Sequence, residues 1–390
     1  MCALRKYIEI IDSAGVIKKV DLCISSRIAE QKHTKQIVCT FNMSKPRLCA
    51  AVVVVVFCAL AAETGAETGC EAIQQINITV YQTVDSVPEV IKTSDTIELG
   101  KDAFHIIVAN QSIPRLCQNN VFIRNELSVL QIINSSIQII QPGSFNVTPT
   151  LTLLKISHNP LNRVGKGVFN HIKVKELDLS RNFISAIDED AFDNNTYLEI
   201  VKLNYNAIKE IESEWFKNSP NVYQLSIIYN EITDIPAEAF KNMAKERPLK
   251  LRFSANRIFQ INAKALEGHN AVDIFRLNGN KLSEIPDNIF ANRTIKSVEV
   301  STNKLRCFPD KLFESKLDVL AFLENPYFEC ACLKKVREYV ERNNIQILYP
   351  AIICEDRPRE VNIVFNFNKT FEIPILPTSL PLIKTPDTTD

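Results

Sequence analysis

The stretches VKELDLSRNFI (174–184) and LEIVKLNYNAI (198–208) share one pattern, LxxLxLxxNxL, and they begin 24 residues apart. Alternating apolar residues such as Leu177 and Leu179 lie on one side of a short strand, so we expect that side to face a core. An Asn side chain both donates and accepts hydrogen bonds, and it can satisfy backbone groups that a bend leaves unpaired. The pattern therefore predicts short parallel strands, each followed by a turn built around Asn.

The same frame extends in both directions, with 22 to 26 residues between successive marker positions. A second column of large apolar residues lies ten residues after eight of these markers, and two columns in one frame indicate a repeat array with an apolar spine on its convex side. The markers are Gln111, Ser135, Asn159, Asn182, Asn206, Asn230, Asn256, Asn280, Asn303 and Asn325. The second column is Phe145, Phe169, Phe192, Phe216, Phe240, Leu266, Phe290 and Phe313.

With this motif, residues 105–358 resemble the extracellular, typical-type leucine-rich-repeat proteins, which include Toll-like receptor ectodomains and secreted recognition proteins. The resemblance implies an α/β repeat solenoid: a leucine-rich-repeat horseshoe with a parallel concave β-sheet, about ten repeats of about 24 residues, and disulfide-stapled terminal caps. It identifies the fold far more specifically than the function, because such scaffolds accept unrelated partners. The repeats themselves are expected over 105–324.

The segment NPYFECACLKKVREYV (325–340) resembles the C-terminal flanking cap of this family, and the cap is expected over 325–358. Its apolar stripe of Leu333, Val336 and Val340 predicts a helix that covers the last coil. The family usually has four cysteines in this cap, whereas this chain has three there and one more in the last full repeat. We expect two disulfides between cap and coil, with their connectivity left open. The four cysteines are Cys307, Cys330, Cys332 and Cys354.

The N-terminal cap is expected over 67–104, with Cys70 and Cys117 as a disulfide that closes a loop over two alternating strands at 78–84 and 96–99. This arrangement departs from the several cysteines that the family usually places there. A long middle without cysteines, flanked by cysteines at both ends, is consistent with stapled caps in an oxidising compartment.

The run LCAAVVVVVFCALAA (48–62) follows Lys45 and Arg47, which predicts a signal peptide over 43–66 and a secreted protein. Residues 1–42 are then a non-native or unstructured extension. The alternative is a type II membrane-anchored chain, although the run is short for a permanent anchor. Residues 359–390 are expected to form an extended Pro/Thr-rich tail, and no stable membrane insertion is expected after signal cleavage.

Charge and histidine placement argue against several functions. With 45 basic and 45 acidic side chains, the chain has no bulk charge that would favour a nucleic-acid partner. The histidines at 105, 158, 171 and 269 are scattered, and nothing predicts that titratable groups converge. We therefore expect no enzyme activity, no catalytic residue, no cofactor and no metal site.

Outward residues of the parallel strands are expected to line the concave face and to bind a ligand. They combine basic, aromatic and aliphatic groups of the kind that form protein-binding hot spots, although mixed charges also simply keep a large sheet soluble. The basic column is interrupted by Asp178, Ser226 and Glu299. The candidate ligand-binding residues are Lys155, Lys202, Arg252 and Arg276, with Tyr205, Tyr229, Leu153, Ile200 and Ile274 beside them.

Sequons for N-glycosylation occur at seven asparagines. Asn110 and Asn134 lie at the N-terminal end of the concave sheet, and glycans on both would shield that end. We therefore expect binding on the central and C-terminal coils. The sequons are Asn77, Asn110, Asn134, Asn146, Asn194, Asn292 and Asn368.

These features predict a recognition or adhesion protein that binds an extracellular protein or glycoconjugate, and the family resemblance suggests innate immunity or cell–cell contact. The alternative is a structural, carrier or inhibitor-like scaffold that sequesters a circulating protein. A homodimer is left open, as are the ligand and the occupied sequons.

Overall fold

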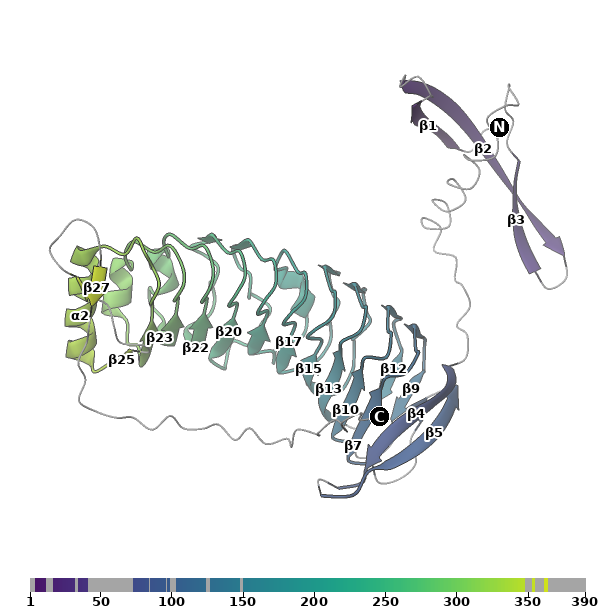
Figure 1. Ribbon diagram of the computed structural model, residues 1–390, viewed down its shortest axis with the longest axis horizontal. Coiled ribbons are helices and arrows are strands. Elements are labelled where there is room, and N and C mark those ends of the chain that lie inside the picture. The colour runs from purple at the N-terminus through teal and green to yellow at the C-terminus, as the bar shows by residue number, and fades with distance from the viewer. Residues whose placement is uncertain are drawn as a thin grey trace, which may run out of the picture. The chain divides into compact units, whose positions relative to one another are not determined.

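The computed structural model describes strands at 4–11, 17–31 and 34–40, residues 73–347 apart from 84, 96, 99–102, 124–126 and 148–149, and strands at 353–354 and 361–363. The chain divides into two compact units, residues 1–70 and 71–390, each of which is described by itself (Figure 1). The predicted signal peptide at 43–66 and nearly all of the predicted tail lie outside the described residues.

The first unit is a small antiparallel sheet of β1 (Leu4–Ile11), β2 (Ile17–Gln31) and β3 (Thr34–Thr40). β2 pairs with β1 through its first half and with β3 through its second half. Residues 1–42 were expected to be a non-native or unstructured extension, and these strands bear only on the second of those alternatives. The strands are rich in Ile, Val and Thr, whose β-branched side chains favour extended backbone.

The second unit is a leucine-rich-repeat fold built on one 13-stranded sheet. From β7 to β25 the strands follow one another in chain order and pair in parallel, as expected when each coil contributes one strand (Figure 1). These strands are β7 (His105–Ala109), β10 (Val129–Ile133), β13 (Leu151–Ser157), β15 (Val174–Asp178), β17 (Ile200–Lys202), β18 (Gln224–Ser226), β20 (Leu249–Arg252), β22 (Ala271–Arg276), β23 (Thr294–Glu299), β24 (Val319–Ala321) and β25 (Gln346–Ile347).

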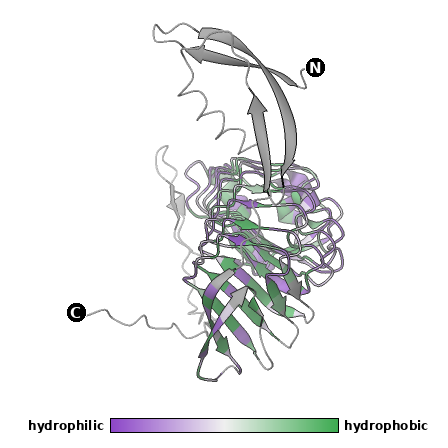
Figure 2. Cartoon of the chain, turned by 90° about the vertical axis from the view of Figure 1, so that its right-hand side faces the viewer, coloured by the Kyte–Doolittle hydropathy of each residue, from purple (hydrophilic) through white to green (hydrophobic). Residues whose placement is uncertain are grey.

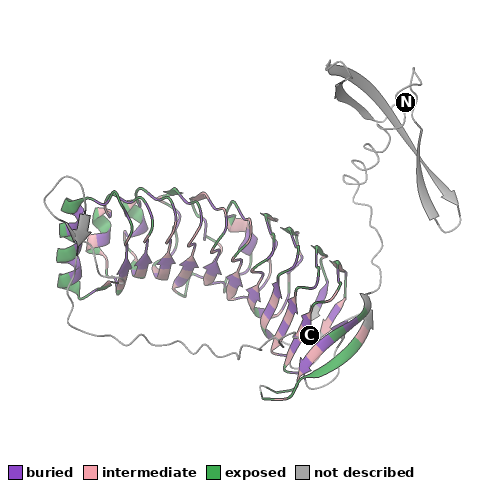
Figure 3. Cartoon of the chain, in the orientation of Figure 1, coloured by how far each residue is buried: buried purple, intermediate pink, exposed green. Residues whose placement is uncertain are grey.

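The core lies between these strands and the return side of each coil. Alternate strand residues are buried, which gives the banded colouring of the strands in Figure 3 and the hydrophobic interior in Figure 2. Leu177 and Leu179 are fully buried, as their alternation predicts. Short return-side elements are β6 (Ile97–Glu98), β8 (Arg115–Leu116), β9 (Val121–Ile123), β11 (Ile139–Ile140), β12 (Phe145–Val147), β14 (Arg163–Val164), β16 (Ala186–Ile187), β19 (Asp234–Ile235), β21 (Gln260–Ile261), η1 (Ser213–Phe216), η2 (Asp287–Ile289) and η3 (Asp310–Glu314).

The predicted phenylalanine spine is confirmed. Rings from successive coils stack with centroids 5.8 Å apart for Phe145 and Phe169, 6.0 Å for Phe169 and Phe192, and 5.7 Å for Phe192 and Phe216. At the C-terminal end the column changes, because Phe313 is only partly buried and meets the edge of Tyr339 from the cap at 5.6 Å.

The marker asparagines form a ladder between coils. The Oδ1 of Asn182 accepts from the backbone N–H of Asn159 at 2.8 Å, and its Nδ2 donates to the carbonyls of Ile156 and Leu179 at 2.8 Å each. The same exchange recurs down to Asn325, whose Oδ1 accepts from the N–H of Leu305 in the preceding coil. Each Asn thus closes its own turn and also satisfies a backbone group of the coil before it, as the donor and acceptor capacity of an amide allows.

The C-terminal end of the array is covered by helix α2 (Cys330–Asn343), which buries Leu333, Val336 and Val340 together with Tyr339. A disulfide joins Cys332 of this helix to Cys307 of the preceding coil. Cys117 and Cys330 are disulfide-bonded as well. Cys70, the predicted partner of Cys117, lies outside the described residues. Only the backbone of Cys354 is described, in β26 (Ile353–Cys354), which pairs with β27 (Val361–Ile363).

At the N-terminal end, strands overlap both predicted cap strands, 78–84 and 96–99, but their bounds and pairing differ from the expectation. A hairpin of β4 (Ile73–Tyr81) and β5 (Glu89–Asp95) continues the main sheet, with β4 antiparallel to β7. The residues around Ile97 instead form β6, which pairs with β9 in a separate return-side sheet. The strand predicted at 78–84 thus begins five residues earlier, at Ile73. The exposed strand β5, whose outward face includes Val90, has no clear alternation of apolar and polar residues.

Candidate recognition surface

The outward residues that alternate with core positions on β10 to β24 form a surface that we call the strand face. The parallel register places four predicted basic residues in its central column, in the order Lys155, Asp178, Lys202, Ser226, Arg252, Arg276 and Glu299. The neighbouring column contains Leu153, Ile200 and Ile274, each partly buried. The sequence frame therefore assigned these residues to the side of the sheet on which the structure places them.

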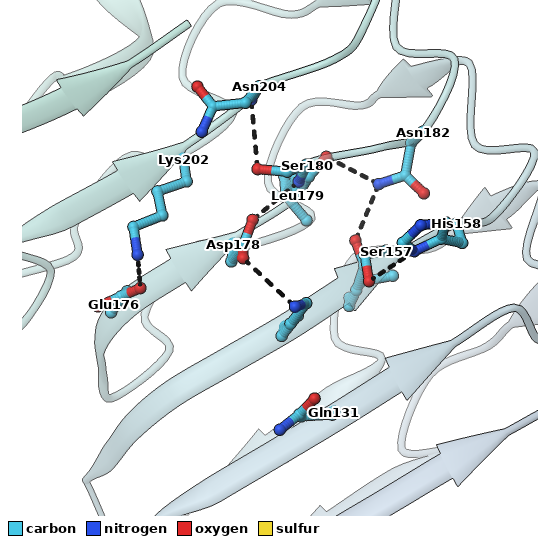
Figure 4. Close-up of polar contacts among 12 residues, drawn as sticks. Gln131, Ser157, His158, Glu176, Asp178, Leu179, Ser180, Asn182, Lys202 and Asn204 are labelled. Atoms are coloured by element: carbon cyan, nitrogen blue, oxygen red, sulfur yellow. Dashed lines mark hydrogen bonds and ion pairs between the residues drawn. The ribbon is translucent and has the colours of Figure 1, made fainter. Parts of the chain in front are cut away.

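Most cations of the central column are paired with carboxylates of adjacent coils. Figure 4 shows the Nζ of Lys202 reaching an oxygen of Glu176, at 2.6 Å. Lys155 lies 4.0 Å from Asp178, and the guanidinium of Arg276 donates to both oxygens of Glu299 at 2.7 Å each. These pairs neutralise much of what the sequence presents as a basic stripe.

Arg252 is the exception in this column. It makes no ion pair with any residue whose side chain the structure describes. Its register neighbours are Ser226 and Arg276, neither of which is an anion. Burial lowers the pKa of the Arg252 guanidinium and the positive charge of Arg276 lowers it further, whereas the negative charge of Glu299 partly opposes this shift. The strand face therefore holds a partly desolvated cation without an internal partner.

The two predicted tyrosines lie not on strands but in the turns directly after them, each one residue before a marker Asn. Tyr205 and Tyr229 both have φ of 56°. Their rings stack with centroids 4.6 Å apart, and the guanidinium carbon of Arg181 lies 4.2 Å from the ring centre of Tyr205. Tyr205 is 42% exposed and Tyr229 is 53% exposed. These three groups, which we call the tyrosine stack, border the strand face and present a solvent-accessible aromatic surface.

Sequence reasoning missed the turn geometry that produces this stack. The left-handed backbone recurs in the residue before the marker in coil after coil, for example at His158, Thr302 and Glu324. A side chain in such a position lies beside the edge of the sheet, and does not project from the face of a strand. The regular spacing was visible in the sequence, but the positive φ was not, since bulky residues seldom adopt it.

Within the described residues, no group of His, Cys, Asp and Glu is arranged to hold a metal ion. A depression of about 540 Å³ lies on the flank of the coils and is lined by charges of both signs, including Glu231 paired with Arg257 at 3.1 Å. The predicted scatter of histidines is what the structure shows: His105 stacks on Tyr81, whereas His269 is buried on the return side.

The repeat architecture is matched by one family model. The model described as "BspA type Leucine rich repeat region" matches residues 116–247 and 249–336, in six copies. The chain belongs to this leucine-rich-repeat family. The general class is the one that the LxxLxLxxNxL pattern predicted, whereas the matching model is the BspA type and not the typical type.

Solved leucine-rich-repeat structures resemble the chain at low identity. A leucine-rich-repeat protein of Leptospira interrogans is 20% identical with a TM-score of 0.46, over 59% of this chain and 61% of that one. Toll, in its Drosophila complex with Spatzle, is 17% identical with a TM-score of 0.48, over 57% and 32%. Toll-like receptor 13, in complex with ssRNA13, is 19% identical with a TM-score of 0.41, over 53% and 35%. The chain thus spans less than two thirds of each, and no curated protein matches it.

Several sequons of this leucine-rich-repeat chain are accessible. Asn77, Asn110, Asn134 and Asn292 are exposed. Asn110 and Asn134 occupy the same turn position as the tyrosine stack, and their side chains are hydrogen-bonded to each other at 2.8 Å. Asn194 is partly buried and donates to Asp193. The side chain of Asn146 and all of Asn368 lie outside the described residues.

Proposed function

We propose that the chain is a secreted, non-enzymatic recognition protein that binds an extracellular protein or glycoconjugate through the strand face and the tyrosine stack. The tyrosine stack carries this proposal. Exposed Tyr and Arg side chains dominate binding hot spots because they bury much area with few rotatable bonds. Stacking between coils holds these rings in place before a partner arrives, which lowers the entropy cost of binding.

Cysteine chemistry supports the extracellular part of the proposal. Cys307 is joined to Cys332, and Cys117 and Cys330 are also in disulfides. Structural disulfides persist mainly in oxidising compartments, and the pattern at 43–66 is that of a signal peptide. Innate immunity or cell–cell contact is the setting in which we propose that this recognition operates.

Glycans would direct a partner toward the central coils. Asn110 and Asn134 lie in the same column of turns as Tyr205 and Tyr229, several coils nearer the N-terminus. Sugars on both would cover the end of the strand face around β7 and β10, because N-linked glycans are bulky. The strand face from β17 to β22 stays open in this arrangement.

Site-specific photo-crosslinking tests the recognition surface. A photoreactive phenylalanine analogue replaces Tyr229 in one variant and Tyr327 in another, since Tyr327 is a 63% exposed tyrosine in the C-terminal cap. After incubation with extracellular fluid or with cells, we expect a discrete crosslinked adduct from position 229 that Tyr205→Ala weakens. Adducts from position 327 alone would refute the proposed surface.

Secretion is tested separately by intact mass and N-terminal sequencing of the protein from conditioned medium, before and after glycan removal. We expect a start between Ala62 and Glu67 and a loss of mass on deglycosylation. A cell-retained chain that keeps residues 1–62 would contradict secretion and indicate the membrane-anchored alternative. In the part of the chain that the structure describes, no helix is long and apolar enough to span a bilayer.

A further inference from the structure

We propose that Arg252 on β20 binds a carboxylate side chain from an acidic segment of a partner protein. This inference rests on the proposed function, because it assumes that the strand face is the recognition surface. It adds the chemistry of the partner and the coil on which the partner is anchored.

The carboxylate whose charge acts on Arg252, that of Glu299, is already bonded to other groups. Both oxygens of Glu299 accept from Arg276, and Glu299 also lies within 3.3 Å of the Nδ2 of Asn278 and of the Oγ of Ser297. Glu299 is only 7% exposed, so it is held in this arrangement. In the central column Arg276 lies between Arg252 and Glu299, which is two strands from Arg252, and the positive charge of Arg276 repels that of Arg252.

A second unpaired cation lies beside Arg252. Lys250 is two residues earlier on the same face of β20, and its Nζ lies 5.6 Å from the ring centre of Tyr223. No ion pair of Lys250 is found among the side chains that the structure describes. Arg247 stacks on the same ring at 3.7 Å but is paired with Glu199 at 3.0 Å. Two of the cations are thus ion-paired, Arg247 with Glu199 and Arg276 with Glu299. Lys250 and Arg252, both on β20, have no ion pair among the side chains that the structure describes.

The surroundings favour a carboxylate of a protein over a polyanion. Partly buried Ile274 lies on the neighbouring strand opposite Lys250, and Ile228 and the exposed ring of Tyr229 follow β18. Polyanions gain affinity from many Lys and Arg contacts, whereas protein hot spots place a few charged groups among aromatic and aliphatic ones. A guanidinium matches a carboxylate through two parallel hydrogen bonds, and partial burial strengthens such a pair.

The test uses the full-length secreted chain and a fluorescein-labelled hexaglutamate peptide, with hexaglutamine as the neutral control and a heparin oligosaccharide as the polyanion. We expect hexaglutamate to bind saturably and Arg252→Gln to weaken it by about tenfold or more. Arg257→Gln is the matched control, because Arg257 is an exposed arginine outside the strand face and is paired with Glu231 at 3.1 Å. It should change the affinity by less than about twofold.

A chemical readout on the unmutated chain keeps the proposal testable if Arg252→Gln folds poorly. Phenylglyoxal should modify Arg252 faster than the doubly bonded Arg276, and hexaglutamate should protect Arg252 selectively. Equal losses in Arg252→Gln and Arg257→Gln, binding of heparin alone, or an Arg252 that the peptide does not protect would each overturn the assignment. If position 229 still crosslinks a partner in that case, the recognition surface stands and only the carboxylate inference fails.

Discussion

At the residue scale, the asparagine ladder shows how one side chain supports two coils. The pairing of Asn182 with Asn159 upstream, and with the carbonyls of Ile156 and Leu179, leaves none of these buried groups without a partner. Leucine at a marker position has a similar size but neither donor nor acceptor. The loss of stability from such a substitution therefore comes from buried backbone groups left without hydrogen bonds, and not from a change in side-chain volume.

We expect Asn182→Leu to lower the free energy of unfolding by about 1–3 kcal/mol, because it leaves buried backbone groups unpaired. Urea denaturation followed by circular dichroism measures this change. Asn288→Leu is the control: Asn288 is exposed in η2, and its replacement should alter stability by less than about 0.5 kcal/mol. Similar effects of the two substitutions would show that the ladder contributes little.

The burial of His269 leads us to expect that the free energy of unfolding falls in mild acid. Burial lowers its pKa from 6.5, and Lys245 and Arg293 lower it further, against hydrogen bonds to the carbonyls of Phe240 and Ala244, which raise it. The unfolded chain therefore binds a proton more readily than the folded one. This contribution to stability is complete above pH 6.5 and declines as the pH falls from there toward the lowered pKa.

Urea midpoints of the native chain and of His269→Gln, measured from pH 8 to pH 5, check this expectation. Gln cannot titrate but retains a donor for the carbonyl of Phe240. We expect the native chain to lose more stability than the variant below about pH 6.5. Parallel curves for the two proteins would assign the acid sensitivity to other groups.

At the scale of elements, the phenylalanine spine and the C-terminal helix hold the coils together by different means. From Phe145 to Phe216 the rings of successive coils stack on one another, so truncating one of them affects more than one coil. The helix α2 instead closes an open end, where its apolar side and one disulfide to the preceding coil prevent exposure of the core.

Phe216→Ala should destabilise the chain by about 3–5 kcal/mol, because it leaves a cavity in a buried column. Phe183→Ala serves as the control, since Phe183 is 68% exposed and removing its ring creates no cavity. Its effect on the urea midpoint should be near zero. A small loss for Phe216→Ala would mean that the neighbouring rings collapse into the space.

Replacing Cys307 and Cys332 together by Ser should cost about 3 kcal/mol, since the disulfide closes a loop of 25 residues. Denaturant unfolding of the double variant measures this cost. The paired replacement avoids a free thiol in the helix. An unchanged midpoint would indicate that packing of Leu333, Val336 and Tyr339 alone secures the cap.

The sequence predicted those strands and helices whose apolar pattern recurs from coil to coil, and it missed those without such a recurring pattern. The strands of the repeats, the phenylalanine column and the helix after Asn325 follow from spacing alone, because each coil repeats the same environment. The hairpin β4–β5 and the sheet of β1 to β3 have no such repetition, and their alternation is short. The sequence analysis also did not predict a second set of buried polar residues, whose side chains form hydrogen bonds with return-side carbonyls. This set is Asn195, Ser219 and His269.

At the scale of the whole repeat array, stability is expected to add up coil by coil, with each coil contacting only its neighbours. The candidate surface is likewise built from one set of residues per coil. The columns of the strand face could be read from the frame, whereas the ion pairs that neutralise Lys155, Lys202 and Arg276 could not. Pairing depends on side-chain reach between coils, which no single coil reveals.

Removing one coil, residues 183–206, should leave a folded but less stable array, since Asn182 is then followed by residues in the correct frame. Removing residues 183–194 instead should abolish cooperative folding, because half a coil breaks every subsequent contact. Thermal unfolding and gel filtration distinguish these outcomes. Cooperative folding of the shorter deletion would contradict a strictly register-dependent array.

The asparagine ladder also sets an order on synthesis. Because the amide of Leu305 is satisfied by Asn325 and that of Ile208 by Asn230, no coil is complete until the next marker has been made. At usual translation speeds of 5–20 residues per second, each new coil waits about 1–5 seconds for its successor. A stalled ribosome thus always displays one unfinished coil, and a nascent chain of any intermediate length offers quality-control chaperones the same kind of edge.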